Sequence, residues 1–241
     1  TAQSLTEIYS GSNWTEVNNA NQARKGAGGV GSTTAGLIFG GDPAPSGQTE
    51  TWNGTNWTEV NDMNTARQYM GAAGIQTGAL AFGGYSSSPT NVTENWNGTN
   101  WTEVNDLNTS RFALCGAGNT NTAALAFGGD SSPKAVTELW NGTNWTEVND
   151  LNTGRERMGG DGTSTSALGF GGNPNPGGRT ESWNGTNWTE VADMIASTDN
   201  AGSAGLNNTS GLSFGGDGVG GSAPRTTATE EFISGSITKT I

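Results

Sequence analysis

Short apolar segments recur along the chain, and small polar residues separate them. One unit holds segments at 70–74, 79–82, 92–96 and 101–104. Each is four or five residues long and bounded by Gly, Asn, Ser or Pro, and three of the four carry β-branched or aromatic side chains, which is typical of strands. Nothing between them is long and periodic enough for a helix. The pattern therefore predicts four short strands in each unit.

The unit repeats with a nearly fixed period. Trp-Thr-Glu-Val begins at Trp14, Trp57, Trp101, Trp145 and Trp188, and Phe-Gly-Gly begins at Phe39, Phe82, Phe127, Phe170 and Phe214. A period of about 44 residues with four strands per repeat is typical of a propeller. Phe-Gly-Gly marks the inner strand pair of each unit. The sequence thus predicts an all-β, five-bladed β-propeller with four antiparallel strands per blade, closed into a ring by terminal strands.

Both ends of the chain carry a version of the outer hairpin. We expect the N-terminal hairpin, 5–17, to complete the blade begun by residues 199–216, because it keeps its Trp. The propeller then spans 1–228, and 229–241 form an extra C-terminal hairpin or tail. The opposite assignment, with the N-terminal hairpin spare, stays open, and a six-bladed ring with an incomplete blade is a weaker alternative. The chain begins at Thr1, which we interpret as a processed form or a part of something longer.

The outer hairpin has a nearly invariant tip. Trp-Asn-Gly-Thr-Asn-Trp begins at Trp52, Trp96, Trp140 and Trp183. Asn-Gly is the strongest short hairpin signal, so we expect a two-residue turn at Asn53-Gly54 that sets Glu50 opposite Trp57. A four-residue loop would instead set Glu50 opposite Glu59, an unfavourable pair of like charges.

These motifs resemble those of the kelch family. An apolar strand ending in Gly-Gly, at 125–129, is followed by Trp140 and Trp145, and an Arg stands before the first strand at Arg24, Arg67, Arg111 and Arg155. The departures are Trp for the usual Tyr in four third strands, a shorter period, and no His after the Arg. The Trp-Asp and Gly-His pattern of WD40 propellers is absent. Similar Gly-rich arrays look like proteins encoded by bacteriophages and marine microbes.

Charge and composition narrow the function. The chain has 241 residues, a net charge of −12, no His and one Cys. Nucleic-acid binding needs a basic stripe that this chain lacks, and no apolar run approaches the length of a membrane span. Without His, the commonest general base and metal ligand are missing, including those that a copper enzyme on a kelch scaffold would need. We therefore expect no catalytic residue, no cofactor, no metal and no enzymatic activity. Cys115, in an apolar stretch, is interpreted as a buried small hydrophobe.

The recurring charged and aromatic residues are interpreted as structural. The Glu of each Thr-Glu recurs once per blade, which favours pairing with Arg or backbone amides over a glycosidase pair. Repeated Trp could form sugar pockets between blades, but in a Gly-rich chain we favour their filling the core. We assign structural roles to the recurring Trp and Arg: Trp14, Trp52, Trp57, Trp96, Trp101, Trp140, Trp145, Trp183, Trp188, Arg24, Arg67, Arg111 and Arg155.

The loop between the second and third strands varies from blade to blade, at 42–48, 85–91, 130–135, 173–179 and 217–225. Variable loops on a fixed scaffold often carry recognition, although ordinary drift explains them as well. The candidate binding-face residues are Asp42, Tyr85, Asn91, Asp130, Asn173, Arg179 and Asp217. The acidic members of this set could bind calcium, but no spacing among them matches a calcium loop, so calcium is a weak alternative.

The expected function is a non-enzymatic binding module, extracellular or on a virion surface, that recognises glycans or cell-surface polymers. The alternative is a structural building block, such as a capsid decoration or fibre segment. Such a block would assemble through its tail and loops with copies of itself or with other virion proteins.

Overall fold

The computed structural model describes residues 2–43, 46–129, 135–174, 178–218, 226–233 and, for the backbone alone, 236–240. The chain divides into two compact units, Thr1–Phe112 and Ala113–Ile241. The described residues form antiparallel strands and no helix, with five four-stranded sheets. These sheets are the blades of a β-propeller, which confirms the predicted fold class.

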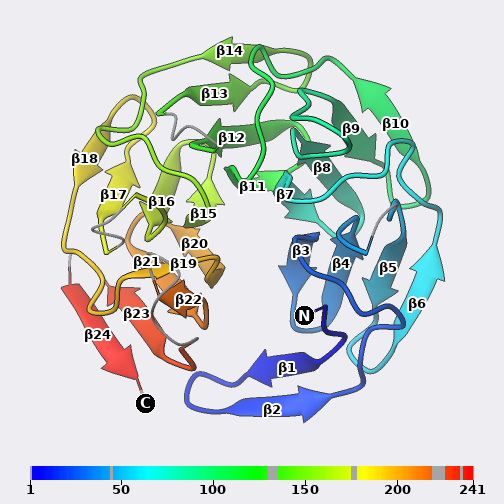
Figure 1. Ribbon diagram of the computed structural model, residues 1–241, viewed down its shortest axis with the longest axis horizontal. Coiled ribbons are helices and arrows are strands. Elements are labelled where there is room, and N and C mark those ends of the chain that lie inside the picture. Colours follow the sequence, from blue (N-terminus) through cyan, green and yellow to red (C-terminus); the bar gives the residue numbers. More distant parts are fainter. Residues whose placement is uncertain are drawn as a thin grey trace. The chain divides into compact units, whose positions relative to one another are not determined.

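The first unit contains a hairpin and two blades (Figure 1). The hairpin is β1 (Thr6–Tyr9) and β2 (Trp14–Val17). The first blade is β3 (Gly28–Ser32), β4 (Ala35–Phe39), β5 (Thr49–Trp52) and β6 (Trp57–Val60). The second blade is β7 (Gly71–Ile75), β8 (Gly78–Phe82), β9 (Thr93–Trp96) and β10 (Trp101–Val104). In each blade the strands pair in chain order.

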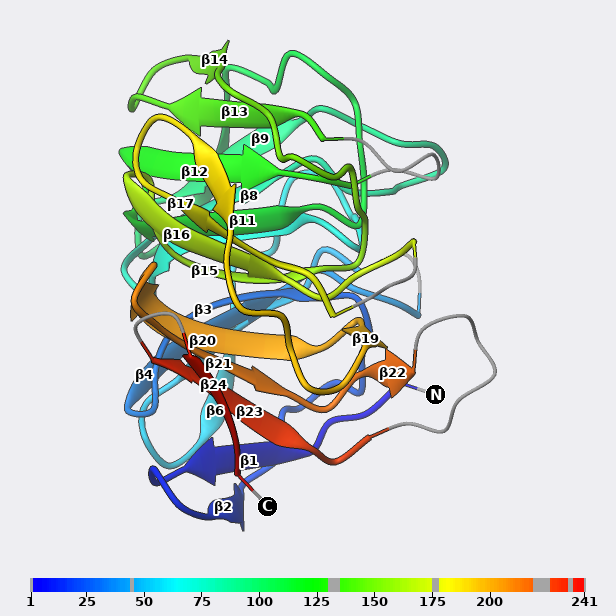
Figure 2. The same ribbon diagram turned by 90° about the vertical axis from the view of Figure 1, so that its left-hand side faces the viewer.

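The second unit contains three blades. The third blade is β11 (Cys115–Thr120), β12 (Ala123–Phe127), β13 (Thr137–Trp140) and β14 (Trp145–Glu147). The fourth is β15 (Gly159–Thr163), β16 (Ser166–Phe170), β17 (Thr180–Trp183) and β18 (Trp188–Glu190). The fifth is β20 (Gly202–Asn207), β21 (Ser210–Phe214), β23 (Thr229–Ile233) and β24 (Ser236–Thr240), with a short pair β19 (Thr198–Asp199) and β22 (Asp217–Gly218) at its end (Figure 2).

The C-terminal hairpin completes the fifth blade. β21 pairs with β23, with Phe214 opposite Thr229, and β23 pairs with β24. The N-terminal hairpin is a separate two-stranded sheet beside the first blade, where the Trp57 indole donates to Thr6 Oγ1 at 3.0 Å. This pairing contradicts the prediction that hairpin 5–17 completes the blade of 199–216. The physical reason is that β23 supplies the same Thr-Glu pair as the other third strands and follows its own inner pair along the chain.

The outer hairpins turn through four residues rather than two. Trp52 lies opposite Trp57, and Glu50 lies opposite Glu59. Asn53 Oδ1 accepts from the backbone N–H groups of Thr55 and Asn56, each at 2.9 Å. The two-residue turn was therefore a wrong prediction. The four-residue turn brings the Trp52 and Trp57 rings into contact, with centroids 5.4 Å apart. Glu50 also pairs with a positively charged residue, and this attraction outweighs the repulsion between Glu50 and Glu59.

That partner is a buried arginine, and the arrangement recurs. Arg24 pairs with Glu50, Arg67 with Glu94 at 3.1 Å, and Arg155 with Glu181 at 2.9 Å. Each guanidinium also donates to two backbone carbonyls of its own blade, which for Arg67 are those of Gly83 and Val92, both at 2.6 Å. Arg111 and Glu138 are likewise fully buried. In the first, second and fourth blades the arginine thus ties the segment before the blade to the third strand.

The tryptophans fill the cores of the blades. Trp96 is fully buried, and Trp52, Trp140 and Trp183 are nearly so. Each of these four indoles donates its N–H to a carbonyl in the turn between the first two strands of its own blade. The Trp101 indole contacts the first blade, where it donates to Thr49 Oγ1 at 3.0 Å and lies on Phe39 at a centroid distance of 4.8 Å, and the Trp188 indole likewise donates to Thr137 Oγ1 of the third blade at 3.1 Å. Trp14 and Trp57 are half-buried. Most of these rings therefore have no face open for a sugar.

The Gly-Gly pair allows consecutive blades to approach closely. The Gly41 N–H donates to the Arg67 carbonyl at 2.8 Å, and a Cβ on Gly40 would lie 2.6 Å from the same oxygen. Both glycines have positive φ, 65° and 103°. A side chain would meet both a steric and a conformational barrier here.

Cys115 is buried, and its thiol donates to the Met158 carbonyl at 2.9 Å. Burial raises the pKa of this thiol to about 12. A thiol held neutral in this way is a poor nucleophile, as the sequence indicated.

Candidate functional site at the loop ends of the blades

At one end of a blade, the connection between the second and third strands pairs with the segment before the first strand. The backbone bridges are Lys25 with Asp42, Gln68 with Tyr85, Glu156 with Asn173, and Asp199 with Asp217. We call this end of each blade its loop end. It carries the variable connections, so it is where the sequence places recognition.

A residue in the left-handed conformation directly follows each of these bridges: Gly26 has φ 62°, and Tyr69, Arg157 and Asn200 have φ between 52° and 56°. Ala113, at the same position of the repeat in the third blade, has φ 53°. A residue other than Gly pays roughly 1–2 kcal/mol for this conformation, so the fold must hold it in place.

Backbone hydrogen bonds hold these positions. Tyr69 N–H donates to the Gly26 carbonyl at 2.7 Å in the first unit. In the second unit Arg157 donates to Ala113 and Asn200 donates to Arg157, both at 2.9 Å. The backbone is therefore the same in these blades while the side chain differs in all five. The sequence analysis did not identify this position. Its signal is a residue type that differs in every repeat, two positions after Arg24, Arg67, Arg111, Arg155 and Thr198.

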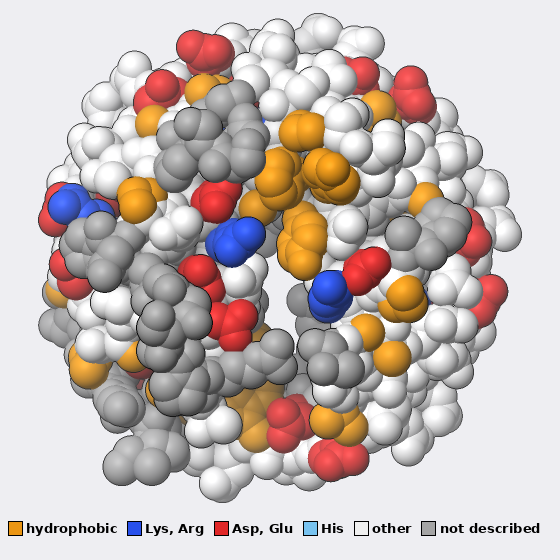
Figure 3. Space-filling view, viewed as in Figure 1, with side chains coloured by type: hydrophobic (Ala, Val, Ile, Leu, Met, Phe, Trp, Pro, Cys, Tyr) orange, Lys and Arg blue, Asp and Glu red, His pale blue; other side chains and the backbone are white. Residues whose placement is uncertain are grey.

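In the first unit the loop end is aromatic. The Tyr69 ring lies over Gly26, where a Cβ would come within 2.8 Å of it. Tyr85 and Phe112 make an edge contact with centroids 5.4 Å apart, and all three rings are half-buried. Figure 3 shows hydrophobic side chains exposed on this face, with basic and acidic side chains nearby.

A charged pair borders the aromatic rings. Lys25 Nζ lies 3.1 Å from Asp42 Oδ2. The hydrogen bond to Asp42, aided by the field of Tyr69, raises the pKa of Lys25. Rings, a fixed charge pair and the Gln68 amide together offer apolar stacking and directed hydrogen bonds, the combination that small-ligand sites use.

In the second unit the loop end is polar. The exposed Arg157 has its Nε 3.9 Å from Glu156 Oε1. Burial raises the pKa of Asp199, and the negative charge of Asp217 raises it further. The positive charge of Arg157 and a hydrogen bond from Asn200 lower this pKa in part. This part of the chain suits hydrogen bonding and charge recognition rather than ring stacking.

The seven predicted binding-face residues separate into three groups. Asp42, Tyr85, Asn173 and Asp217 lie at loop ends as described. Asn91 and Arg179 serve the scaffold: the Asn91 amide donates to the Leu107 carbonyl at 3.1 Å, and the Arg179 carbonyl accepts from Arg155 at 2.7 Å. Asp130 lies outside the described residues.

Two further observations concern the described residues alone. They hold no group of three or more His, Cys, Asp or Glu side chains arranged to bind a metal ion. None of their segments is a helix with the length and apolar character needed to cross a bilayer.

No protein-family model and no curated protein matches this chain.

One carboxyl away from the loop ends gives a test of pH dependence. Burial raises the pKa of Asp161, on β15, to about 7 from an ordinary 3.8. A hydrogen bond from the Gly162 N–H has the opposite, smaller effect on this pKa. The folded state then holds a proton that the unfolded state releases, so stability is full below about pH 4 and falls as pH rises to 7. We expect Asp161→Asn to stabilise the protein by about 1–3 kcal/mol at pH 8, less than the full shift because the side chain is only half-buried.

Urea denaturation at pH 5 and pH 8 measures this effect. Asp161→Asn should remove much of the stability difference between the two pH values, whereas the exposed Asp62→Asn should leave it unchanged. Equal pH dependence in wild type and Asp161→Asn would contradict the assignment.

Proposed function

We propose that this protein is a non-enzymatic binding module that recognises neutral glycans or similar cell-surface polymers through the loop ends of its blades. The observation that carries the proposal is a constant left-handed backbone position that bears five different residues: Gly26, Tyr69, Ala113, Arg157 and Asn200. A position that is strained, held by hydrogen bonds and varied in side chain is suited to recognition rather than packing. Arg157 and Asn200 are exposed there and Tyr69 is half-buried, whereas Ala113 is buried.

The aromatic loop end of the first unit supports a sugar as ligand. Tyr69, Tyr85 and Phe112 supply apolar ring faces, and Gln68, Lys25 and Asp42 supply donors and acceptors beside them. Rigid aromatic side chains give a large contact area at low entropic cost. These rings, rather than the buried tryptophans, are the ones able to stack on a sugar.

Charge favours a neutral polymer over an anionic one. The chain carries a net charge of −12, which repels sulfated or phosphorylated polymers at long range. Lys25, the cation that lies beside these rings, is already paired with Asp42.

A kelch-like propeller placed outside the cell or on a virion surface is part of the same proposal. The Arg before the first strand, the Gly-Gly after the second and the paired Trp of the outer hairpin support the kelch-like assignment. The acidic, Asn- and Thr-rich surface suits an extracellular or virion setting.

A glycan array followed by titration tests the proposal. We expect binding to neutral glycans, weakened about 10-fold or more by Tyr69→Ala because aromatic anchors dominate such interfaces. Tyr9→Ala, in the N-terminal hairpin, is the matched control and should leave affinity unchanged. Equal loss in both variants, or no binding to any neutral glycan, would contradict a loop-end glycan site.

The alternative, a structural building block, has one observation in its favour. Leu5, just before the N-terminal hairpin, and Ile233, the last residue of β23, are 61% and 51% exposed. Native mass spectrometry that finds stable assemblies together with a blank glycan array would favour this alternative.

A further inference from the structure

The N-terminal hairpin has the form of the outer half of a blade. β1 and β2 pair in the same register as β5 and β6, with Thr6 opposite Val17 at the first position. In each complete blade the third strand pairs with a second strand as well, but within the described residues β1 pairs with β2 alone. The hairpin therefore corresponds to the third and fourth strands of a blade without its inner pair.

The other edge of β1 is open. The Ser10 N–H donates to the Asn13 carbonyl at 3.0 Å across the hairpin turn. Backbone groups alternate in direction along an antiparallel strand, so those of Ile8 face β2, whereas those of Glu7 and Tyr9 face the other way. In the first blade the equivalent edge of β5 pairs with β4. β1 thus presents donors and acceptors with which a further strand can pair.

The Glu7 side chain lacks the surroundings of its counterparts. Glu50, Glu94 and Glu181 are 0%, 0% and 1% exposed, and each pairs with an arginine from the segment before its own blade. Glu7 is exposed, and no cation pairs with it among the described residues. In the complete blades that arginine is continuous in sequence with the first two strands. The cation and the strands that the hairpin lacks would therefore come from one segment.

The first strand of the first blade has an uncovered side. In the second unit, a Cβ on Gly160 of β15 would lie 2.6 Å from the Phe127 ring of the preceding blade. At the equivalent Gly29 of β3, a Cβ would meet only the Leu37 carbonyl of its own blade, at 3.7 Å, among the described residues. Gly29 is exposed, whereas Gly160 is half-buried. β3 packs beside β7 on one side, and its other side lacks a comparable neighbour.

Backbone groups at this side also lack the partners found elsewhere. At the other junctions that the structure describes, the left-handed residue donates its N–H to its counterpart in the preceding blade. The Gly26 N–H has no acceptor among the described residues. The Arg67 carbonyl accepts from the second glycine of the preceding Gly-Gly pair at 2.8 Å. The Arg24 carbonyl accepts from the Gln3 N–H instead, at 3.3 Å.

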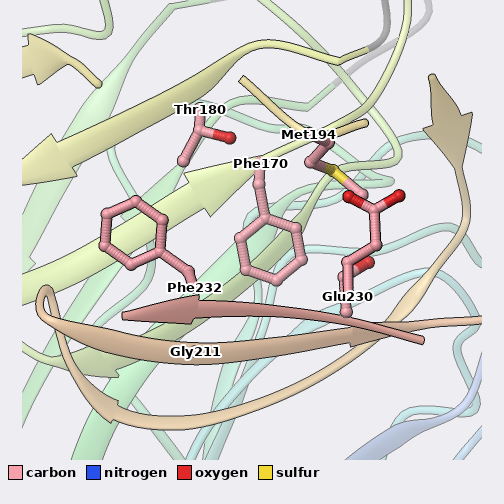
Figure 4. A pocket seen from close by; sticks show the side chains of 7 residues that line it. Phe170, Thr180, Met194, Gly211, Glu230 and Phe232 are labelled. Atoms are coloured by element: carbon pink, nitrogen blue, oxygen red, sulfur yellow. The ribbon is translucent and has the colours of Figure 1, made fainter. Parts of the chain in front are cut away.

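The complete blades show what covers such a surface. In the fourth blade, Phe170 ends the second strand opposite Thr180 of the third, and both side chains line the small space drawn in Figure 4. Thr6, the counterpart of Thr180, has no described residue opposite it on that edge. The repeat therefore specifies the sequence of the missing pair: an arginine, a Gly-rich first strand, and a second strand that ends in Phe-Gly-Gly.

We propose that the open edge of β1 and the uncovered side of β3 bind an inner strand pair of this repeat type from another polypeptide segment. The bound pair completes a further four-stranded blade around the N-terminal hairpin. Its arginine pairs with Glu7, its second strand pairs with β1, and its Gly-Gly donates to the Arg24 carbonyl. An unrelated strand could satisfy the edge of β1, as in strand addition generally, but it would leave the other two groups without partners.

A labelled peptide with the sequence of residues 67–84 serves as the probe, because it contains the arginine, both strands and Phe-Gly-Gly. Fluorescence anisotropy measures its binding to the full chain. We expect saturable binding, and no binding of a peptide with the same residues in scrambled order. Phe82→Ala in the peptide should weaken binding about 10-fold or more, because this ring is fully buried in its own blade.

A charge variant of the hairpin tests the predicted ion pair. Glu7→Gln should weaken binding about 10-fold, because it removes the charge that pairs with the peptide arginine. Glu16→Gln, on the paired strand of the same hairpin, is the matched control and should have no effect. With an Arg67→Gln peptide, Glu7→Gln should cause little further loss, since the two groups act as a pair.

Amide hydrogen exchange followed by NMR locates the bound peptide. The N–H groups of Glu7 and Tyr9 should exchange more slowly when the peptide is bound, whereas that of Ile8, which faces β2, should change little. The proposal is overturned by the absence of saturation, by equal binding of the scrambled peptide, or by equal effects of Glu7→Gln and Glu16→Gln. A dimer of the chain that protects the same amides without peptide would also overturn it, because a second copy would then be the occupant.

Discussion

Replacing Arg67 with Met is expected to lower the free energy of unfolding by about 3–5 kcal/mol, because it leaves a buried carboxylate without its cation. Arg67 and Glu94 are both inaccessible to solvent in their side chains. Burial lowers the pKa of Arg67, and the attraction of Glu94 opposes that effect. Removal of the guanidinium also takes the Arg67 donor from the Gly83 and Val92 carbonyls, of which the Val92 carbonyl keeps the hydrogen bond from the Gly83 N–H. Denaturation in guanidinium chloride measures the loss.

A double-mutant cycle separates the ion pair from the packing. Arg67→Met with Glu94→Gln should cost less than the sum of the two single changes, since the amide leaves no unpaired charge behind. Strict additivity, or a single-variant cost below about 1 kcal/mol, would show that the pair does not hold the blade together.

Replacing Trp96 with Ala is expected to cost about 3–5 kcal/mol, the range for deleting a large buried aromatic side chain. Trp96 is fully buried, its centroid lies 5.4 Å from that of Trp101, and its N–H donates to the Gln76 carbonyl at 2.9 Å. The change would leave a cavity in the core shared with Leu37, Phe39 and Ala79.

Trp96→Phe serves as the internal control. It keeps a ring and loses the hydrogen bond and part of the volume, so we expect a smaller cost of about 1–2 kcal/mol. Thermal and chemical unfolding of both variants would reveal the difference. Equal costs would mean that the hydrogen bond, rather than the buried volume, dominates at this position.

The fold could be predicted because each repeat carries its own local signals. Gly-Gly after the second strand, the Asn-Gly hairpin tip and the fixed spacing of Trp each indicate a blade. The length of the hairpin turn could not be predicted, because it depends on Arg24, which is distant in sequence and neutralises Glu50 only in the folded blade. The rule that like charges disfavour cross-strand pairing takes account of Glu59 but not of Arg24.

The choice of closing hairpin failed for a related reason. Trp14 favours the N-terminal hairpin and Thr229-Glu230 favours the C-terminal one, and the structure shows that the Thr-Glu pair accompanies the third strand of the fifth blade. At the loop ends, no propensity identifies a left-handed Tyr69 or Arg157, because neighbouring backbone groups impose that conformation. The sequence does show that the residue two positions after each of the four arginines, and after Thr198, differs from repeat to repeat.

The hydrogen-bonded left-handed position has a consequence for evolution. Its backbone geometry is set by neighbours, so exchanging the residue there leaves the blade cores undisturbed. Selection can therefore diversify this position in most blades, as a small combinatorial library displayed on a conserved frame, whereas Gly26 is coupled to the Tyr69 ring that lies over it. New specificity could arise by substitution alone, without insertions and without compensating mutations elsewhere in the protein.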